Sequence, residues 1–229
     1  MRTLDRYWLL LRHRLRYDGA WAAWWAVTKC ARRFGHLELA FLYERDLTQP
    51  LSAAGARVPV ELAHATAADA AEIAALMAEG NANEVARHAQ AIARRLARGE
   101  ICFLARAGAR IVHYNWISFG WKESLAGRVI VLAKDAAYCG GAYTAEGWRG
   151  LAIHTEVNAA MLRFLRDHGY RRAYTFVHAD NRSSRKTIQR LGWKRSGVMA
   201  AFTPKGAAQA RIWRLAGTLD PFVGQRVPA

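Results

Sequence analysis

A stretch in the second half of the chain combines a basic residue, a small-residue turn and the start of a helix. Residues 143–154 read Tyr-Thr-Ala-Glu-Gly-Trp-Arg-Gly-Leu-Ala-Ile-His. A strand is predicted before the turn, from Asp135 to Tyr143, and apolar residues at helical spacing predict a helix after it. Backbone N–H groups at a helix start lack partners within the helix, and the positive end of the helix dipole lies behind them. This arrangement favours a phosphate or pyrophosphate ligand.

A second stretch follows about thirty residues later. A predicted strand from Arg171 to His178 leads into Asp-Asn-Arg-Ser-Ser at residues 180–184, then a short helix, then Leu-Gly-Trp at 191–193. The complete order is strand, phosphate turn, helix, strand, Asn-x-x-Ser, helix and Leu-Gly-aromatic. This order resembles the GNAT superfamily of N-acetyltransferases, which bind acetyl-coenzyme A.

The resemblance rests on two motifs and covers roughly Val58 to Leu215. The family's Gln/Arg-x-x-Gly-x-Gly/Ala motif stands here as Arg149-x-x-Ala152-x-His154, so the basic position matches and both later small positions differ. The family's Asn-x-x-Ala and Gly-Phe motifs stand here as Asn181-x-x-Ser184 and Gly192-Trp193. Both motifs occur at the family's spacing.

The resemblance implies an α/β (α+β) fold, with a central mixed, mostly antiparallel sheet of six to seven strands flanked by about four helices. We expect a basic, Trp-rich helical extension over residues 1–46, a linker over 47–57, the acyltransferase domain over 58–216 and a tail over 217–229. Within the domain, hydrophobic periodicity and turn residues predict further strands and helices. The strands are Val58–Ala65, Ile101–Arg106, Arg110–Phe119, Lys194–Phe202 and Arg211–Leu215, and the helices are Ala67–Met77 and Asn83–Arg98.

The resemblance also implies a binding site for acetyl-CoA or another acyl-CoA. Its residues would be Tyr143, Thr144, Arg149, Gly150, Leu151, Ala152, Ile153, His154, Asn181 and Ser184. The strand before the turn is expected to splay from the next strand and to hold the pantetheine arm. Ala152 can replace the family's glycine if the backbone there does not need a positive φ. His154 would either donate to a phosphate oxygen or turn to solvent.

The proton-transfer residue departs from the family pattern. Many members carry a Tyr four residues before the Gly-Phe glycine, whereas this chain has Ile188, which cannot transfer a proton. The remaining titratable candidates are His178, His113, Tyr138, Tyr143, Glu146 and Asp180. We nominate His178, because histidine suits proton transfer near neutral pH and this one ends the strand beside the expected acetyl position. Capping of the next helix is the structural alternative for His178, and water is an alternative acid.

Composition indicates a protein of a reducing compartment with an excess of positive charge. The 229 residues carry a net charge of +16, and the three cysteines have no paired spacing that would suit a zinc site or a disulfide framework. Such charge attracts anionic partners, although a scattered positive surface needs no dedicated partner. No metal site is expected. We see no signal peptide and no apolar run long enough to cross a bilayer.

The first 46 residues differ from the rest by interleaving tryptophans with basic residues. Two helices are predicted, separated near Asp18-Gly19, with Trp21, Trp24 and Trp25 on one face of the second. Such a helix suits the headgroup region of an anionic membrane, but tryptophans also pack against a domain or a second subunit. Deleting Met1 to about Asp46 is expected to leave coenzyme A affinity intact and to weaken binding to anionic vesicles.

The sequence thus predicts a cytoplasmic acyl-CoA-dependent N-acyltransferase, either free or peripheral on the inner membrane face. Its acceptor would be an amine of a small molecule or sugar precursor. One alternative is a catalytically degenerate module of this shape that binds an anionic membrane or nucleic acid, and another is an acetyltransferase for protein amines. Nucleic acid is the less expected partner, because the sequence has no zinc finger or helix-turn-helix. A homodimer is left open.

Overall fold

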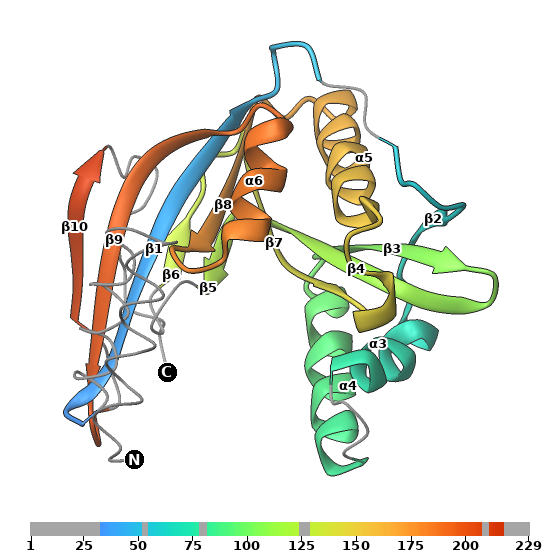
Figure 1. Cartoon of the computed structure of the whole chain (residues 1–229), viewed down its shortest axis with the longest axis horizontal. Coiled ribbons are helices and arrows are strands. Elements are labelled where there is room, and N and C mark those ends of the chain that lie inside the picture. Colours follow the sequence, from blue (N-terminus) through green and yellow to red (C-terminus); the bar gives the residue numbers. More distant parts are fainter. Residues whose placement is uncertain (1–32, 52–54, 78–81, 124–128, 208–210, 218–229) are drawn as a thin grey trace, which may run out of the picture.

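The computed structural model describes residues 33–51, 55–77, 82–123, 129–207 and 211–217. Its centre is an eight-stranded sheet in the order β10-β9-β1-β8-β7-β4-β3-β2 (Figure 1). The predicted mixed, mostly antiparallel class is confirmed, with eight strands where six to seven were expected, and the β7–β8 pair is parallel. The strands are β1 (Gly35–Asp46), β2 (Glu61–His64), β3 (Ile101–Ala107), β4 (Arg110–Phe119), β7 (Ala136–Thr144), β8 (Arg172–His178), β9 (Lys194–Pro204) and β10 (Arg211–Gly217).

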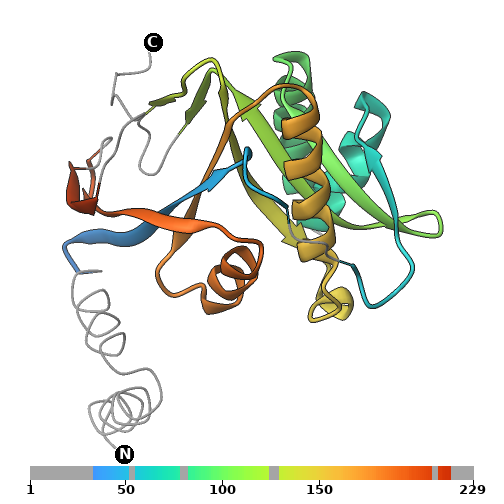
Figure 2. The same ribbon diagram turned by 90° about the horizontal axis from the view of Figure 1, so that it is seen from above.

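Helices cover both faces of the sheet. Two of them, α5 (Ile153–Asp167) and α6 (Arg182–Arg190), lie on one face, whereas α3 (Ala70–Met77) and α4 (Ala82–Ala97) lie on the other (Figure 2). A short hairpin of β5 (Trp121–Glu123) and β6 (Val129–Val131) stands apart from the main sheet. The four α-helices among the described residues match the number expected to flank the sheet.

Each helical layer buries its own apolar cluster against the sheet. On one side, Val157, Met161 and Leu165 of α5 pack with Phe103 and Ile117 from the strands. On the other side, Ile73 of α3 and Ile92 of α4 pack with Leu104, Tyr114 and Trp116. Full burial of such a side chain contributes about 1.5–3 kcal/mol. The sheet is therefore held between two independent cores.

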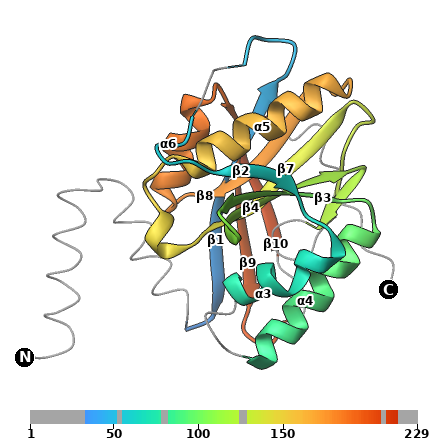
Figure 3. The same ribbon diagram turned by 90° about the vertical axis from the view of Figure 1, so that its right-hand side faces the viewer.

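The segment β7–α5–β8 is the unit that carries the predicted phosphate turn. A parallel neighbour requires a crossover connection, and α5 supplies it (Figure 3). The observed strands Ala136–Thr144 and Arg172–His178 each lie within one residue of the predicted bounds. Between β7 and α5 the chain forms a short 3-10 turn, Glu146–Trp148.

The predicted helical extension is wrong for its last twelve residues. Gly35–Asp46 is the strand β1, which pairs with β8 on one side and β9 on the other. Its run Ala40-Phe41-Leu42-Tyr43 is buried because a central strand is covered on both faces. A boundary at residue 46 therefore does not separate this segment from the sheet. Residues 1–32, which include the four N-terminal tryptophans, lie outside the described residues.

The predicted linker crosses the core surface as it leaves β1. Leu47 is fully buried, and its N–H donates to the carbonyl of Arg171 at 2.9 Å. Farther on, the N–H of Arg57 donates to the carbonyl of Leu151 in the phosphate turn, also at 2.9 Å. The next strand is shorter than predicted, because only Glu61–His64 pairs with β3. Most of the tail, residues 218–229, lies outside the described residues. No helix in the described ranges is long and apolar enough to cross a membrane.

Candidate functional site

The parallel strands β7 and β8 separate soon after they begin. They pair over only three positions, from Ala136↔Arg172 to Tyr138↔Tyr174. At the point of separation the hydroxyl of Tyr138 accepts the N–H of Phe176 at 3.4 Å, in place of a strand partner. A cleft of about 420 Å³ opens beyond this point, lined by both strands, α5 and α6. The predicted splay of these strands is therefore present.

Two glycines shape the wall of this cleft on β7. A side chain on Gly140 would come within 2.7 Å of the Tyr138 ring, so the ring can lie there only because position 140 has none. Gly141 has a φ of +74°, and the register with β4 shifts at this point, between Tyr114 and Trp116. A glycine with positive φ is typical of a β-bulge. The bulge turns this strand segment away from regular pairing and toward the cleft.

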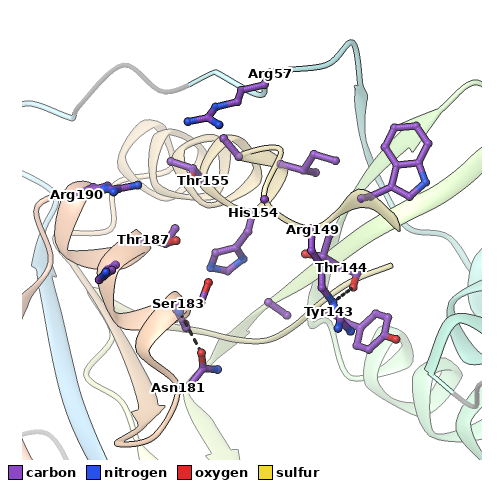
Figure 4. Close-up of a pocket in the computed structure, with 17 residues that line it drawn as sticks. Arg57, Tyr143, Thr144, Arg149, His154, Thr155, Asn181, Ser183, Thr187 and Arg190 are labelled. Atoms are coloured by element: carbon purple, nitrogen blue, oxygen red, sulfur yellow. Dashed lines mark hydrogen bonds between the residues drawn. The ribbon is translucent and has the colours of Figure 1, made fainter. Parts of the chain in front are cut away.

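The phosphate turn opens into a second cavity of about 610 Å³ (Figure 4). Nine of the ten residues expected to bind the cofactor line it, namely Tyr143, Thr144, Arg149, Gly150, Ala152, Ile153, His154, Asn181 and Ser184. Leu151 is not part of its wall, because it packs against the main core and its carbonyl is occupied by Arg57. Residues Ala142, His154, Asn181 and Ser184 line both the cavity and the cleft, so the two spaces adjoin.

The turn reaches its shape through strained backbone at Ala152. This residue lies immediately before α5 with φ 60° and ψ 13°, in the left-handed region. Ala152 is the one non-glycine residue with positive φ in the described part of the chain. The condition under which alanine could replace glycine without strain, a φ that is not positive, is therefore not met. The left-handed conformation of Ala152 places the first turn of α5 beside the cavity. This conformation is unfavourable for a residue that has a Cβ atom.

Four basic side chains gather around the cavity from separate segments. They are Arg57 from the connection after β1, Arg149 from the turn, and Lys186 and Arg190 from α6. Among the described lining residues none is Asp or Glu. The side chain of Arg149 folds back toward β7, where its Nε donates to the Thr144 carbonyl at 3.1 Å. This charge suits an anionic ligand with several phosphate groups.

The sequence reasoning missed three of these cations. The sequence could have predicted Lys186 and Arg190 as a pair. They stand four residues apart, so they share one face of the short helix after Asn181. The sequence could not have predicted Arg57, because this residue belongs to the predicted linker. A tertiary hydrogen bond from its N–H to the Leu151 carbonyl holds it beside the cavity.

His154 is half-buried with its ring pointing inward, and it neighbours the buried His113 on β4 (Figure 4). Their ring centres are 5.3 Å apart, and both Nε2 atoms are buried without a hydrogen-bond partner in the described chain. The Nδ1 of His113 lies 2.7 Å from the Thr144 hydroxyl. Burial lowers the pKa of His154 to about 4, and burial together with repulsion from His154 places the pKa of His113 well below its ordinary value. Of the two alternatives expected for His154, the one in which it turns to solvent is wrong, because its Nε2 is buried.

Asn181 and Ser184 form the start of α6 where it meets the cavity. The Asn181 side-chain oxygen accepts the N–H of Ser184 at 3.0 Å, so Asn181 caps the helix (Figure 4). The cap orients the first turn of α6 toward the phosphate turn across the cavity. One residue thus both fixes the helix and lines the site.

No protein-family model and no curated protein matches this sequence. Solved structures do resemble the chain. A tandem GNAT protein from the clavulanic acid biosynthesis pathway aligns with a TM-score of 0.54 at 15% identity, covering 81% of this chain and 56% of that one. A GNAT-family acetyltransferase from Colwellia psychrerythraea aligns with a TM-score of 0.53 at 14% identity, covering 74% and 57%. The chain has the GNAT fold.

A third structure, an N-acetyltransferase from Sphaerobacter thermophilus, agrees with this assignment. It aligns with a TM-score of 0.52 at 11% identity and covers 88% of this chain and 58% of that one. The chain therefore spans less than two thirds of the length of each of these three proteins. At such identities the likeness concerns the fold.

Within this GNAT fold, the cleft holds four titratable side chains: Tyr138, Cys139, His154 and His178. Burial raises the pKa of both Tyr138 and Cys139 to about 12, and it lowers that of His154 to about 4. These three groups are therefore poorly matched to proton transfer at neutral pH. His178 is exposed at the end of β8 and lines the cleft. Ile188, which replaces the family's tyrosine, is buried and also lines it.

The other acid–base candidates are not brought into the cleft. His113 neighbours His154 but does not line the cleft, and Tyr143 lines the cavity, where its ring stacks on Tyr114 with the ring centres 6.1 Å apart. Glu146 is exposed in the 3-10 turn and Asp180 is exposed before α6, and neither lines the cavity or the cleft. The geometry leaves His178 as the candidate with access to both the cleft and solvent.

Proposed function

We propose that this protein is an acyl-CoA-dependent N-acyltransferase that transfers an acetyl group from acetyl-CoA to an amine of a small molecule or sugar precursor. The observation that carries the proposal is the continuity of two spaces. A cavity ringed by four cations and by a strained helix start adjoins a cleft between splayed strands. A polyphosphate head and a thin arm that ends in a reactive group fit such a pair of spaces.

The residues present fit coenzyme A. Arg57, Arg149, Lys186 and Arg190 would hold the phosphate groups, together with the N–H groups at the start of α5. His154, with its buried and unpartnered Nε2, would contact the ligand where the cavity meets the cleft. Beyond Tyr138, the β8-facing edge of β7 has no partner strand in the described chain, so its peptide groups can hold the arm.

The reaction requires orientation, polarisation and one proton. Coenzyme A supplies an acyl thioester, whose carbonyl carbon accepts the amine as the bond to sulfur breaks. The fixed peptide groups of β7 at Gly140 and Gly141 would orient the thioester and polarise its oxygen. His178 would give a proton to the leaving sulfur and recover one from the amine nitrogen through solvent. Water is the alternative proton donor.

The first test measures ligand binding by the full chain. Acetyl-CoA, coenzyme A and longer acyl-CoAs are compared by thermal shift and calorimetry, because a ligand that binds only the folded state raises the melting temperature. We expect a clear shift that is largest for one acyl length, followed by release of free thiol when amines are added. No binding at near-millimolar ligand would contradict the proposal.

Arg149→Glu tests the location of the site. The substitution places a negative charge against the phosphate groups, so we expect coenzyme A binding to be abolished in a protein that still melts cooperatively. Arg110→Glu is the matched control, because Arg110 is exposed on β4 and takes no part in the cavity. Wild-type affinity in Arg149→Glu would refute the proposed site.

A catalytically degenerate module is the second candidate, and Ile188 is the observation that favours it. An aliphatic side chain lines the cleft where related enzymes carry their acid. Such a module would bind anionic lipid or nucleic acid and would release no thiol from acyl-CoA with any amine. Turnover that is lost in His178→Ala and retained in Ile188→Val would exclude this reading and support His178.

A further inference from the structure

An arginine stands beside the β7 bulge on the sheet face opposite α5. Arg95 belongs to α4, and its guanidinium lies 3.8 Å from the centre of the Trp116 ring. Its Nε and Nη2 donate to one oxygen of Glu100, at 3.0 and 2.7 Å. Stacking and a two-point hydrogen bond together fix the orientation of a planar guanidinium. Arg95 is therefore preorganised.

The fixed orientation directs the remaining nitrogen to the cleft wall. Nη1 lies 3.7 Å from the position that a Cβ atom on Gly141 would occupy, and Trp116 lies 3.6 Å from it. Gly141 is exposed, lines the cleft and forms the bulge. The hydrogen bonds of Arg95 with the described chain use Nε and Nη2, so Nη1 is open to a ligand at the bulge.

The surroundings leave Arg95 with attraction for an anion. Glu100 also pairs with Arg98 at 3.2 Å and accepts the Ser118 hydroxyl at 2.6 Å. Glu100 thus shares its carboxylate between Arg95 and Arg98. The Arg95 side chain is 22% exposed, which reduces screening by water. A compact anion at Nη1 would be a second partner for the Arg95 charge.

This position is separate from the proposed donor phosphate site. Those cations line the cavity at the start of α5, whereas Arg95 belongs to α4 and stacks on Trp116. The helices α3 and α4 lie on the other face of the sheet from α5 (Figure 2). A donor entering along α5 and a second substrate entering along α4 would meet at Gly140 and Gly141. The second substrate would therefore pass Arg95 as it approaches the thioester.

We infer that Arg95 binds a carboxylate of the acceptor, so that the acceptor is a small amine that carries a carboxylate a few bonds from its nitrogen. The inference rests on the proposed acyl transfer and names its substrate class. Arg95 acts as a binding and specificity residue, not in proton transfer.

The test compares matched amines as acceptors for the full chain with saturating acetyl-CoA. Each pair differs only in the carboxylate, as in β-alanine and its amide, or glutamate and its diamide. We expect kcat/KM to favour the carboxylates by about ten- to a hundredfold, the range of one charge-assisted hydrogen bond. If kcat/KM of the wild-type protein is equal within every pair, the inference is overturned and no variant is needed.

Variants locate the effect. Arg95→Gln should raise KM for the carboxylates about tenfold or more. It should leave kcat, KM for acetyl-CoA and KM for the amides unchanged. Arg95→Lys should recover part of the preference for carboxylates. Arg94→Gln removes an exposed charge one residue away and serves as the control. Unchanged preference in folded Arg95→Gln overturns the assignment. If the protein transfers acetyl to none of the amines, the result contradicts the proposed function and not the assignment of Arg95.

Discussion

At the scale of single residues, Ala152 shows how the phosphate turn keeps its shape without the glycine that its backbone favours. A left-handed conformation costs an L-residue roughly 1–2 kcal/mol. The surrounding contacts must supply this energy, and they include the hydrogen bond from Arg57 to the neighbouring Leu151. Strain of this kind concentrates at binding sites. The strained residue here lies in the wall of the basic cavity.

Ala152→Gly should relieve that strain. Glycine also gains freedom in the unfolded chain, which offsets part of the benefit, so we expect a net stabilisation of about 0.5–1 kcal/mol. Urea unfolding of the two proteins measures the difference. Ala152→Val is the opposite control, because a β-branched side chain suits this conformation less than alanine. A glycine variant that is less stable than wild type would contradict the strained backbone.

The buried histidines make stability depend on pH. His154 titrates at about 4 in the folded protein, below the ordinary histidine value of 6.5, because it is buried. The unfolded chain therefore takes up a proton first as pH falls. The neutral histidine stabilises the fold fully above pH 6.5, and about 3 kcal/mol of that stability is lost as pH falls to 4. His113, whose pKa is also lowered, adds to the loss.

Unfolding midpoints measured from pH 7.5 to 4.5 would show this loss in wild type. His154→Gln, which keeps a polar side chain and cannot titrate, should lose less stability over the same range. Carboxylates elsewhere affect both proteins equally, so the difference reports His154 together with its repulsion of His113. Identical pH slopes in the two proteins would show that His154 is not buried in its neutral form.

At the scale of elements, the helices and strands whose ends carry glycines or capping residues could be predicted from the sequence. Glycines end the predicted helices and strands around the site, and at the start of the first helix the N–H of Thr66 donates to Asp69. The elements β3, β4, β7 and β8 accordingly lie within one residue of their predicted bounds. Because both motifs lie on β7–α5 and β8–α6, the candidate cavity could also be predicted.

Elements and residues that depend on distant partners could not be predicted. The apolar run of β1 suits a buried helix as well as a central strand, and only pairing with β8 and β9 decides between them. Arg57 reaches the cavity through one tertiary hydrogen bond, and Arg95 reaches the bulge from a helix on the far face. Neither has a neighbour in the sequence that reveals its role.

The position of β1 reverses the expected effect of truncation. Removing residues 1–46 deletes a strand between β8 and β9 and four consecutive buried side chains, Ala40 to Tyr43. At about 1.5–3 kcal/mol for each large apolar side chain, the loss is on the order of the stability of a whole domain. We expect this fragment to be insoluble or to melt without cooperativity. The fragment 33–229 is the control, and it should bind acetyl-CoA as the full chain does.

At the scale of the whole molecule, positive charge gathers around the basic cavity and in the first segment of the chain. Four cations surround the donor cavity on one face of the sheet, and Arg95 stands on the other. The first 32 residues add seven Arg or Lys against two Asp, together with four of the nine tryptophans. A basic, Trp-bearing segment suits the surface of an anionic membrane.

Vesicle binding separates the two roles open to that segment. The full chain and the fragment 33–229 are compared on vesicles with and without anionic lipid, at low and high salt. If the segment binds lipid, its removal should weaken binding to anionic vesicles by roughly tenfold or more and leave the melting temperature unchanged, since each basic residue near such a surface contributes about 1 kcal/mol. High salt should weaken binding of the full chain as well.

If the tryptophans instead pack on the domain or a second subunit, the fragment will melt earlier and will bind vesicles as the full chain does. The two outcomes exclude each other because a tryptophan buried against protein cannot also lie in the headgroup region.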